Sequence, residues 1–184
     1  IKFLFSLFGR SWNDFYGWML DYQDRQVTLQ KILSRKGPKN RYKGLWHWEK
    51  GEDYLKYMVK HGLKPNHTVF DLGCGYGRCT IPLLKYQNIK GHYIGSEISK
   101  RRLALAQEWI DAEKLTEKSY ALVFSKCTSL SFIKDNSVDV VWVLSVFNHM
   151  PDNVLEQTLS ALKTKVKKGG FIFQQFNLLG KMNA

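Results

Sequence analysis

The stretch Thr68-Val-Phe-Asp-Leu-Gly-Cys-Gly-Tyr-Gly-Arg-Cys79 decides the fold, because it has the pattern of a short buried strand that turns through glycines into a helix. Its apolar residues are Val69, Phe70 and Leu72, and Asp71 stands near the carboxyl end of the predicted strand. Open α/β sheets bind their ligands at that end. The glycines permit positive φ angles and let a ligand approach bare backbone. They are Gly73, Gly75 and Gly77.

The spacing of these glycines indicates which kind of cofactor the turn binds. A dinucleotide fingerprint places its third glycine five residues after the first, and that position is Arg78. The chain has the spacing D-x-G-x-G-x-G instead. The carboxylate of Asp71 would repel a diphosphate but attract an ammonium or a sulfonium. We therefore expect a cofactor that is cationic near this turn.

The segment from Asp71 to Gly77 resembles the first motif of the class I S-adenosylmethionine-dependent methyltransferases, and the resemblance extends over residues 50–177. It implies S-adenosyl-L-methionine as cofactor, with Asp71 facing the methionine ammonium directly or through water. The glycines, together with Cys74, would admit the cofactor. The alternative is an ordinary glycine-rich turn that binds nothing.

A second acidic residue supports the cofactor interpretation. Residues 91–97 have the pattern of a second strand, and the strand ends in Glu97. This residue follows the glycine turn by about the 20 residues that nucleotide-binding folds use. By resemblance to the family, Glu97 accepts the ribose hydroxyls and Ile98 belongs to the same pocket. The alternative is a surface glutamate before a helix that Ser99 caps, a helix that opens with three basic residues.

The third predicted strand covers residues 120–124 and leads to Cys127 and Thr128. Related proteins often carry an acid here that contacts the adenine amino group. This chain has Cys127 instead. The resemblance therefore assigns adenine recognition to backbone groups around Cys127 and Thr128, or to nearby side chains.

The fourth predicted strand, residues 138–144, is almost continuously apolar, as a central parallel strand should be. The segment after it borders the point where a methyl group would meet its acceptor, and it contains Ser145 and His149. His149 is a candidate general base, or else a packing residue at the mouth. The segment lacks the Asn/Asp-Pro-Pro-aromatic tetrad and the Pro-Cys pair of base-modifying relatives. It resembles the branch that methylates a metabolite, a lipid or a quinone-like ring.

The C-terminal part predicts a helix from residue 151 to 168, which Gly169 and Gly170 stop, and then a fifth strand over residues 171–176. Val154, Leu155, Leu159, Leu162 and Val166 are expected to face the sheet. The family usually continues with another helix and a hairpin, so the hypothesis here is a fragment of a longer product. Its fifth strand would be an exposed edge, open to oligomer formation.

Residues 1–49 are predicted to form an N-terminal cap on a domain of residues 50–184. A helix from Ser11 should cluster its aromatic side chains and Met19 on one face, continue through Val27 to Leu33, and form a lid or a subunit contact. A basic stretch with interleaved aromatics follows, and resemblance assigns Tyr42 and Trp46 to the cofactor pocket. The clustered residues on the helix are Trp12, Phe15, Tyr16, Met19 and Tyr22.

Composition limits the remaining choices. A chain of 184 residues suits one domain with an appendage, and a net charge of +12 favours an affinity for polyanions, either nucleic acid or an anionic membrane surface. The three cysteines have neither the spacing of a disulfide framework nor that of a metal site, which favours a cytoplasmic protein that binds no metal.

The prediction from sequence is thus an α/β fold, a doubly wound open parallel sheet of order 3-2-1-4-5 with right-handed crossovers and an N-terminal helical extension. The predicted function is methyl transfer from S-adenosylmethionine to a small-molecule, lipid or quinone-like acceptor. Two alternatives stay open: an RNA methyltransferase, and a non-catalytic cofactor-binding module that partners an active subunit.

Overall fold

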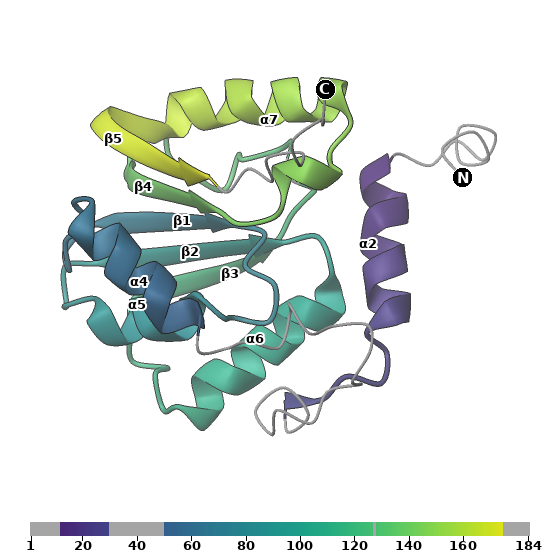
Figure 1. The fold of residues 1–184 in the computed structure, drawn as a ribbon, viewed down its shortest axis with the longest axis horizontal. Helices are drawn as coiled ribbons and strands as arrows, with labels where there is room; N and C mark the ends of the chain where they lie inside the picture. The colour runs from purple at the N-terminus through teal and green to yellow at the C-terminus, as the bar shows by residue number, and fades with distance from the viewer. Residues whose placement is uncertain (1–11, 30–49, 127, 175–184) are drawn as a thin grey trace, which may run out of the picture.

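The protein is described here by a computed structural model that covers residues 12–29, 50–126 and 128–174. Its centre is a parallel sheet of order β3-β2-β1-β4-β5, which confirms the predicted order (Figure 1). The central strand, β1, pairs with β2 and β4, and Asp71 lies opposite Gly95 on one side and Trp142 on the other. The strands are β1 (Thr68–Leu72), β2 (His92–Glu97), β3 (Tyr120–Phe124), β4 (Val138–Val143) and β5 (Val166–Gln174).

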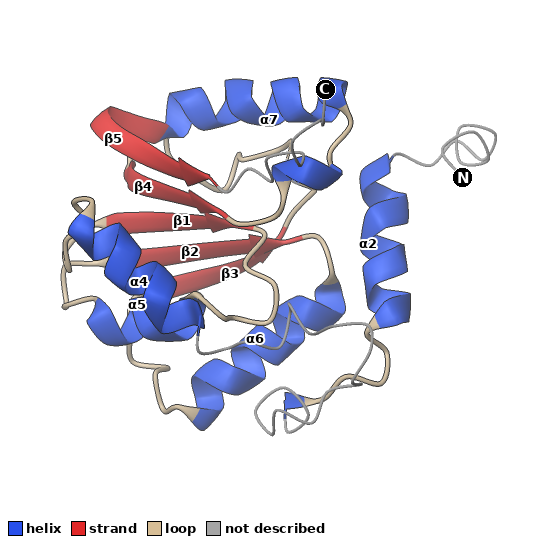
Figure 2. Cartoon of the chain, viewed as in Figure 1, coloured by secondary structure: helices blue, strands red, loops and turns tan. Residues whose placement is uncertain are grey.

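Helices cover both faces of the sheet, and this gives the doubly wound architecture (Figure 2). Alternate residues of the central strands feed two apolar cores: Val69 packs with one, and Phe70 packs with the other. The first core lies under α4 (Lys50–Lys60), α5 (Thr80–Tyr86) and α6 (Lys100–Ala112). The second contains Leu162 of α7 (Asp152–Lys165).

Several helix ends follow the local rules that the sequence suggested. Gly62, just after α4, has a φ of +106°. Ser99 caps α6 by accepting a hydrogen bond from the Arg102 N–H. At the other end of α6, Leu115 donates to Ile110 O and Lys114 donates to Asp111 O. That pair of bonds is the Schellman motif, with Lys114 at a φ of +56°.

The N-terminal helix α2 (Trp12–Gln23) ends earlier than predicted. The expectation that it continues through Val27 is wrong, because the chain turns there: Asp24 N donates to Leu20 O, and Val27 N donates to Asp24 O. An ion pair explains the turn, since Asp24 binds the Arg102 side chain of α6 at 2.6 Å and is only 1% exposed. This pair holds the end of α2 against α6, so that α2 lies across the carboxyl ends of the strands (Figure 1).

The boundary between α7 and β5 also differs from the prediction. The helix ends at Lys165, and Val166 already pairs with Val138 in the sheet. The next paired residue is Phe171, opposite Val140, so the glycines predicted to stop the helix lie in an irregular part of β5. A salt bridge between Lys167 and Asp139 holds this segment against β4.

The predicted face of α7 is correct only in part. Val154 and Leu162 are buried, whereas Leu159 is 42% exposed and Val166 belongs to the strand. Within the described residues, β5 pairs only with β4. The oligomer contact at its edge stays a prediction, and so does the domain boundary at residue 50. Among the described helices, none has both the length and the apolar character needed to cross a bilayer.

Candidate active site

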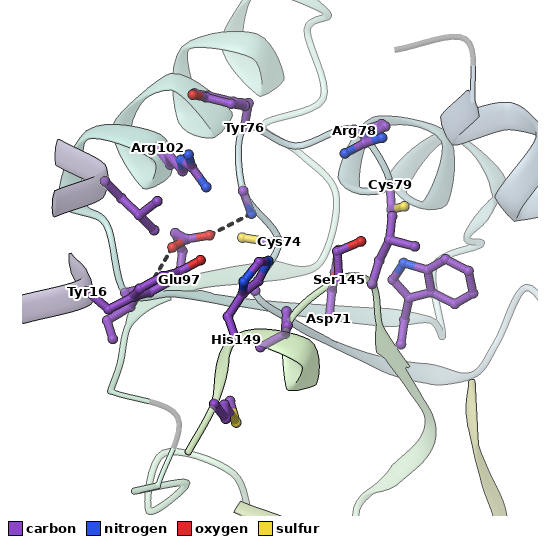
Figure 3. Close-up of a pocket in the computed structure, with 18 of the residues that line it drawn as sticks. Tyr16, Asp71, Cys74, Tyr76, Arg78, Cys79, Glu97, Arg102, Ser145 and His149 are labelled. Atoms are coloured by element: carbon purple, nitrogen blue, oxygen red, sulfur yellow. Dashed lines mark hydrogen bonds between the residues drawn. The ribbon is translucent and has the colours of Figure 1, made fainter. Parts of the chain in front are cut away.

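A cavity of about 640 Å³ opens where β1, β2 and β4 end, and α2 forms its outer wall. Figure 3 shows side chains from separate elements that converge on it: Asp71 from β1, Glu97 from β2, and Tyr16 from α2. His149 reaches it from η1 (Phe147–His149), the short helix after β4. The cavity therefore lies at the edge of the sheet where the sequence placed a ligand.

The glycine turn forms the floor of the cavity. The N–H groups of Gly73 and Cys74 both donate to Ser96 O, at 2.8 and 2.9 Å, and this ties the turn to the end of β2. Gly73 has a φ of +78°, and a Cβ there would lie 2.4 Å from Val146 Cγ2. Gly75 has a φ of +58°, and a Cβ there would meet nothing within 4 Å. The turn thus leaves open space directly above Gly75, as a bound ligand requires.

Glu97 is fixed by three backbone N–H groups. Its Oε2 accepts from Gly75 at 2.9 Å, and its Oε1 accepts from Ile98 at 2.8 Å and from Ser99 at 2.9 Å (Figure 3). Burial raises the pKa of Glu97, and this effect is opposed by Arg102 and by these N–H groups. Two carboxylate oxygens offer about four acceptor positions, so three bonds leave capacity for a ligand hydroxyl.

Asp71 is 2% exposed and lies at the end of a buried chain of hydroxyls. The Tyr93 hydroxyl donates to Asp71 Oδ2 at 2.9 Å. Because this uses the single hydrogen of that hydroxyl, the Thr80 hydroxyl, 2.6 Å away, is the donor to Tyr93. Burial raises the pKa of Asp71 to about 7, because it outweighs the lowering effect of the Tyr93 bond. The negative charge of Glu97 also raises this pKa, while Arg78 lowers it. A cationic ligand in the cavity would complete the ionisation of this carboxyl group.

The side of the cavity that α2 forms is aromatic. Tyr16 stacks on Trp12 at 4.8 Å and on His149 at 5.7 Å between ring centroids. Burial raises the pKa of Tyr16, so its hydroxyl stays protonated and available as a donor. Ser145 lies beside this group with a φ of +56°, a left-handed conformation that is uncommon outside glycine and that recurs at functional sites.

Most of the predicted site residues meet in this one cavity. Gly77 and Thr128 do not line it: Gly77 faces Ala106 of α6 instead, and Thr128 donates its N–H to Lys126 O. Tyr42, Trp46 and Cys127 lie outside the described residues. The predicted residues that line the cavity are Asp71, Gly73, Cys74, Gly75, Glu97, Ile98, Ser145 and His149.

Sequence reasoning missed several residues that line the cavity, among them Tyr76, Arg78, Arg102 and Trp142. Arg102 pairs with Asp24 and lies 5.1 Å from the Tyr76 ring centre, which explains one of the three basic residues that open α6. The Nε1 of Trp142 is buried without a hydrogen-bond partner in the described part of the chain. The unfavourable basic run at the start of α6 is the one local signal that could have drawn attention to Arg102, although it does not report the partner Asp24.

Comparison with known proteins identifies the family. A family model described as a methyltransferase domain matches residues 69–170, more than half of the chain. The chain belongs to the class I S-adenosylmethionine-dependent methyltransferases. S-Adenosylmethionine is therefore the cofactor of this fold. The described residues of the methyltransferase fit it: Glu97 can accept hydroxyls, Asp71 is a carboxyl group without a full counter-charge, and Gly75 leaves room above the turn.

Curated relatives share the same region. An uncharacterized methyltransferase of Schizosaccharomyces pombe is 31% identical over 68% of this chain and 45% of its own length. The demethylmenaquinone methyltransferase of Lactiplantibacillus plantarum is 31% identical over 67% of this chain and 48% of its own. The 2-methyl-6-phytyl-1,4-hydroquinone methyltransferase of a Synechocystis strain is 31% identical over 65% of this chain and 36% of its own length. The chain thus spans half or less of the length of these relatives.

Solved structures share the fold of this methyltransferase at lower identity. A methyltransferase from Aquifex aeolicus superposes with a TM-score of 0.57 at 23% identity, over 77% of this chain and 69% of its own. The [4+2]-cyclase SpnF superposes with a TM-score of 0.64 at 19% identity, over 87% and 58%. These likenesses show the fold alone, because one fold carries several reactions.

Proposed function

We propose that this methyltransferase transfers the methyl group of S-adenosylmethionine to a small apolar acceptor, a quinol-like ring or a related lipid. The observation that carries the proposal is the aromatic wall over the cavity, made by Trp12 and Tyr16 and continued by His149. Flat aromatic faces suit a planar apolar ring. Two relatives are named for acceptors of this kind, demethylmenaquinone and a phytyl hydroquinone.

The residues of this chain would position the reactants more than change them. Bound S-adenosylmethionine supplies a methyl group that is already activated on a sulfonium. Glu97 would accept a ribose hydroxyl, and ionised Asp71 would face the ammonium. The α2 wall would exclude water and hold the acceptor ring, which is where most of the acceleration of such a displacement arises.

His149 would act as the general base. Its ring lines the cavity, stacks on Tyr16 and belongs to a residue that is exposed to solvent, so a proton taken there can leave to water. A quinol hydroxyl or an acidic ring carbon loses a proton as it is methylated. A base positioned for that proton typically accelerates the reaction by about 10²- to 10⁴-fold.

The first test is calorimetric titration with S-adenosylhomocysteine. We expect saturable binding by the parent chain and binding at least about tenfold weaker by Glu97→Gln, because the charged, buried acceptor for a ribose hydroxyl is replaced by a neutral amide. Glu113→Gln is the matched control, since this glutamate pairs with Lys85 away from the cavity. Absence of binding by a folded parent would contradict the proposal.

The second test measures transfer of a labelled methyl group to reduced demethylmenaquinone and to short-chain hydroquinones. His149→Gln should lower kcat by about tenfold or more and leave the affinity for S-adenosylhomocysteine unchanged. His61→Gln is the control, because His61 lies in the turn after α4 and its ring contacts Tyr57 O, away from the cavity. Cofactor binding without turnover of any apolar acceptor would favour the non-catalytic module instead.

A further inference from the structure

The outer side of α2 is aromatic and exposed. Phe15, Trp18 and Tyr22 recur every three or four residues, and together with Arg25 of the turn after α2 they form what we call the outer aromatic face. Trp18 and Tyr22 are each 56% exposed, stack on one another at 5.6 Å, and lie opposite the buried row of the helix. Among the described elements, α2 is the outermost at this end of the sheet (Figure 1).

The acidic residues of α2 and of the turn after it are all engaged by groups of the domain. Asp14 pairs with Lys126, Asp21 accepts from Ser99 and from the Arg101 N–H, and Asp24 pairs with Arg102. The outer aromatic face keeps a cation instead, because the Arg25 guanidinium lies 4.2 Å from the centre of the Tyr22 ring.

A second pair of the same kind lies nearby. Phe124 is 44% exposed, with the Lys100 ammonium 5.1 Å from its ring centre. Lys100 precedes Arg101, which contacts α2 through Asp21. The surface around α2 thus combines exposed aromatic rings with cations.

The outer aromatic face also borders the cavity. Met19 follows Phe15 by one helical turn and lines the cavity together with Trp12 and Tyr16. Apolar side chains therefore run without interruption from the exposed side of α2, over its edge, to the aromatic wall of the site. A molecule that leaves an apolar phase at this face would not have to cross water to reach the cavity.

We propose that the outer aromatic face docks on the surface of an anionic lipid bilayer. Trp and Tyr rings accompanied by Arg or Lys are the side chains that prefer the boundary between headgroups and acyl chains. The chain has the complementary charge, +12, and the sequence just before α2 opens with an apolar run, residues 1–8, whose single charged side chain is Lys2. Docking itself needs no methyl transfer, whereas delivery of an acceptor from the bilayer rests on the proposed function.

The test is co-sedimentation with vesicles of phosphatidylglycerol and phosphatidylethanolamine, compared with vesicles of phosphatidylcholine. The parent should bind the anionic vesicles, and more weakly as salt rises. The double variant Trp18→Ser with Tyr22→Ser should lose at least about tenfold in partition coefficient, because two large aromatic surfaces are removed. The control is Ile89→Ser, which removes a side chain that is 97% exposed elsewhere.

Equal binding of the double variant and the parent, or no binding of the parent to anionic vesicles, would overturn the proposal. Sedimentation velocity without lipid adds a separate readout: a parent dimer that the double variant disrupts would assign the face to a second copy of this chain. Calorimetric titration with S-adenosylhomocysteine runs on the same samples. Retained cofactor binding in the double variant separates a failure of docking from a failure of the proposed function.

Discussion

Asp71→Asn should make the cofactor-free domain more stable while it impairs the site. The substitution preserves shape, and the Asn oxygen can still accept the hydrogen bond from the Tyr93 hydroxyl. It removes only the ability to carry a negative charge. Any change in the free energy of unfolding therefore reports the cost of ionising a buried carboxyl group.

The size of this cost follows from the pKa. Burial raises the pKa of Asp71 from 3.8 to about 7. Between these two values the folded chain holds a proton that the unfolded chain has lost, so the free energy of unfolding falls as pH rises. The full loss corresponds to about 4 kcal/mol, which is a large part of the stability of an ordinary domain. Asp71→Asn should match the parent near pH 4 and exceed it by up to about 4 kcal/mol above pH 7.

Urea unfolding of both proteins from pH 4 to pH 8 measures the difference. Asp139→Asn is the control of opposite sign: burial alone would raise the pKa of Asp139, but Lys167 and the Thr68 N–H lower it below its usual value. The ionised Asp139 stabilises the domain above its pKa in the unfolded chain, and this stability is lost as pH falls through its lower pKa in the folded chain. Asp139→Asn should therefore destabilise the domain at neutral pH. A difference between Asp71→Asn and the parent that stays constant with pH would refute the reasoning.

Three further predictions follow from single contacts. Tyr93→Phe removes the hydrogen bond to Asp71, so the pH at which S-adenosylhomocysteine binding is half-maximal should rise by about one unit, as calorimetry across pH would show. Lys114→Gly relieves a left-handed residue at the end of α6 and should raise the free energy of unfolding by about 1 kcal/mol in urea; no gain would contradict the strain. Gly75→Ala should cost about 1 kcal/mol in stability but weaken cofactor binding by more than tenfold, since its Cβ would enter open cavity space; unchanged binding would mean that the cofactor does not pass over the turn.

The sheet could be predicted from sequence because each strand carries its own signal. The apolar run of β4 has no polar residue after Asp139, as a strand buried on both faces requires. The strand order is the one that the resemblance to the family implies. The end of α7 was less predictable. Val166 fits the apolar spacing of the helix and of a strand equally well, and only the pairing with Val138 decides between them.

The site residues likewise divide into those that a local sequence pattern predicts and those that depend on contacts distant in the sequence. Asp71 and Glu97 could be found because each ends a strand at the ligand-binding edge, where local position in the sequence is also position in space. Tyr16 was placed on the correct helix, on a face predicted to form a lid or a subunit contact. Which residues of that face line the cavity was not predicted, because the rotation of α2 depends on distant contacts such as that of Gly17 with Ile98. Arg102 depends on Asp24, 78 residues away, and no local pattern reports such a pair.

The two buried carboxyl groups explain why cofactor and fold should stabilise one another. Glu97 lies among backbone donors and near Arg102, so its charge is compensated within the chain. The charge of Asp71 is compensated less, because burial outweighs the Tyr93 hydrogen bond and the nearby Arg78 and raises the pKa of Asp71 to about 7. A cationic ligand that supplies the missing charge lowers this pKa, and by linkage it recovers the stability that ionisation costs. The stabilisation by S-adenosylhomocysteine should therefore be larger at pH 8 in the parent than in Asp71→Asn, where there is no charge to compensate.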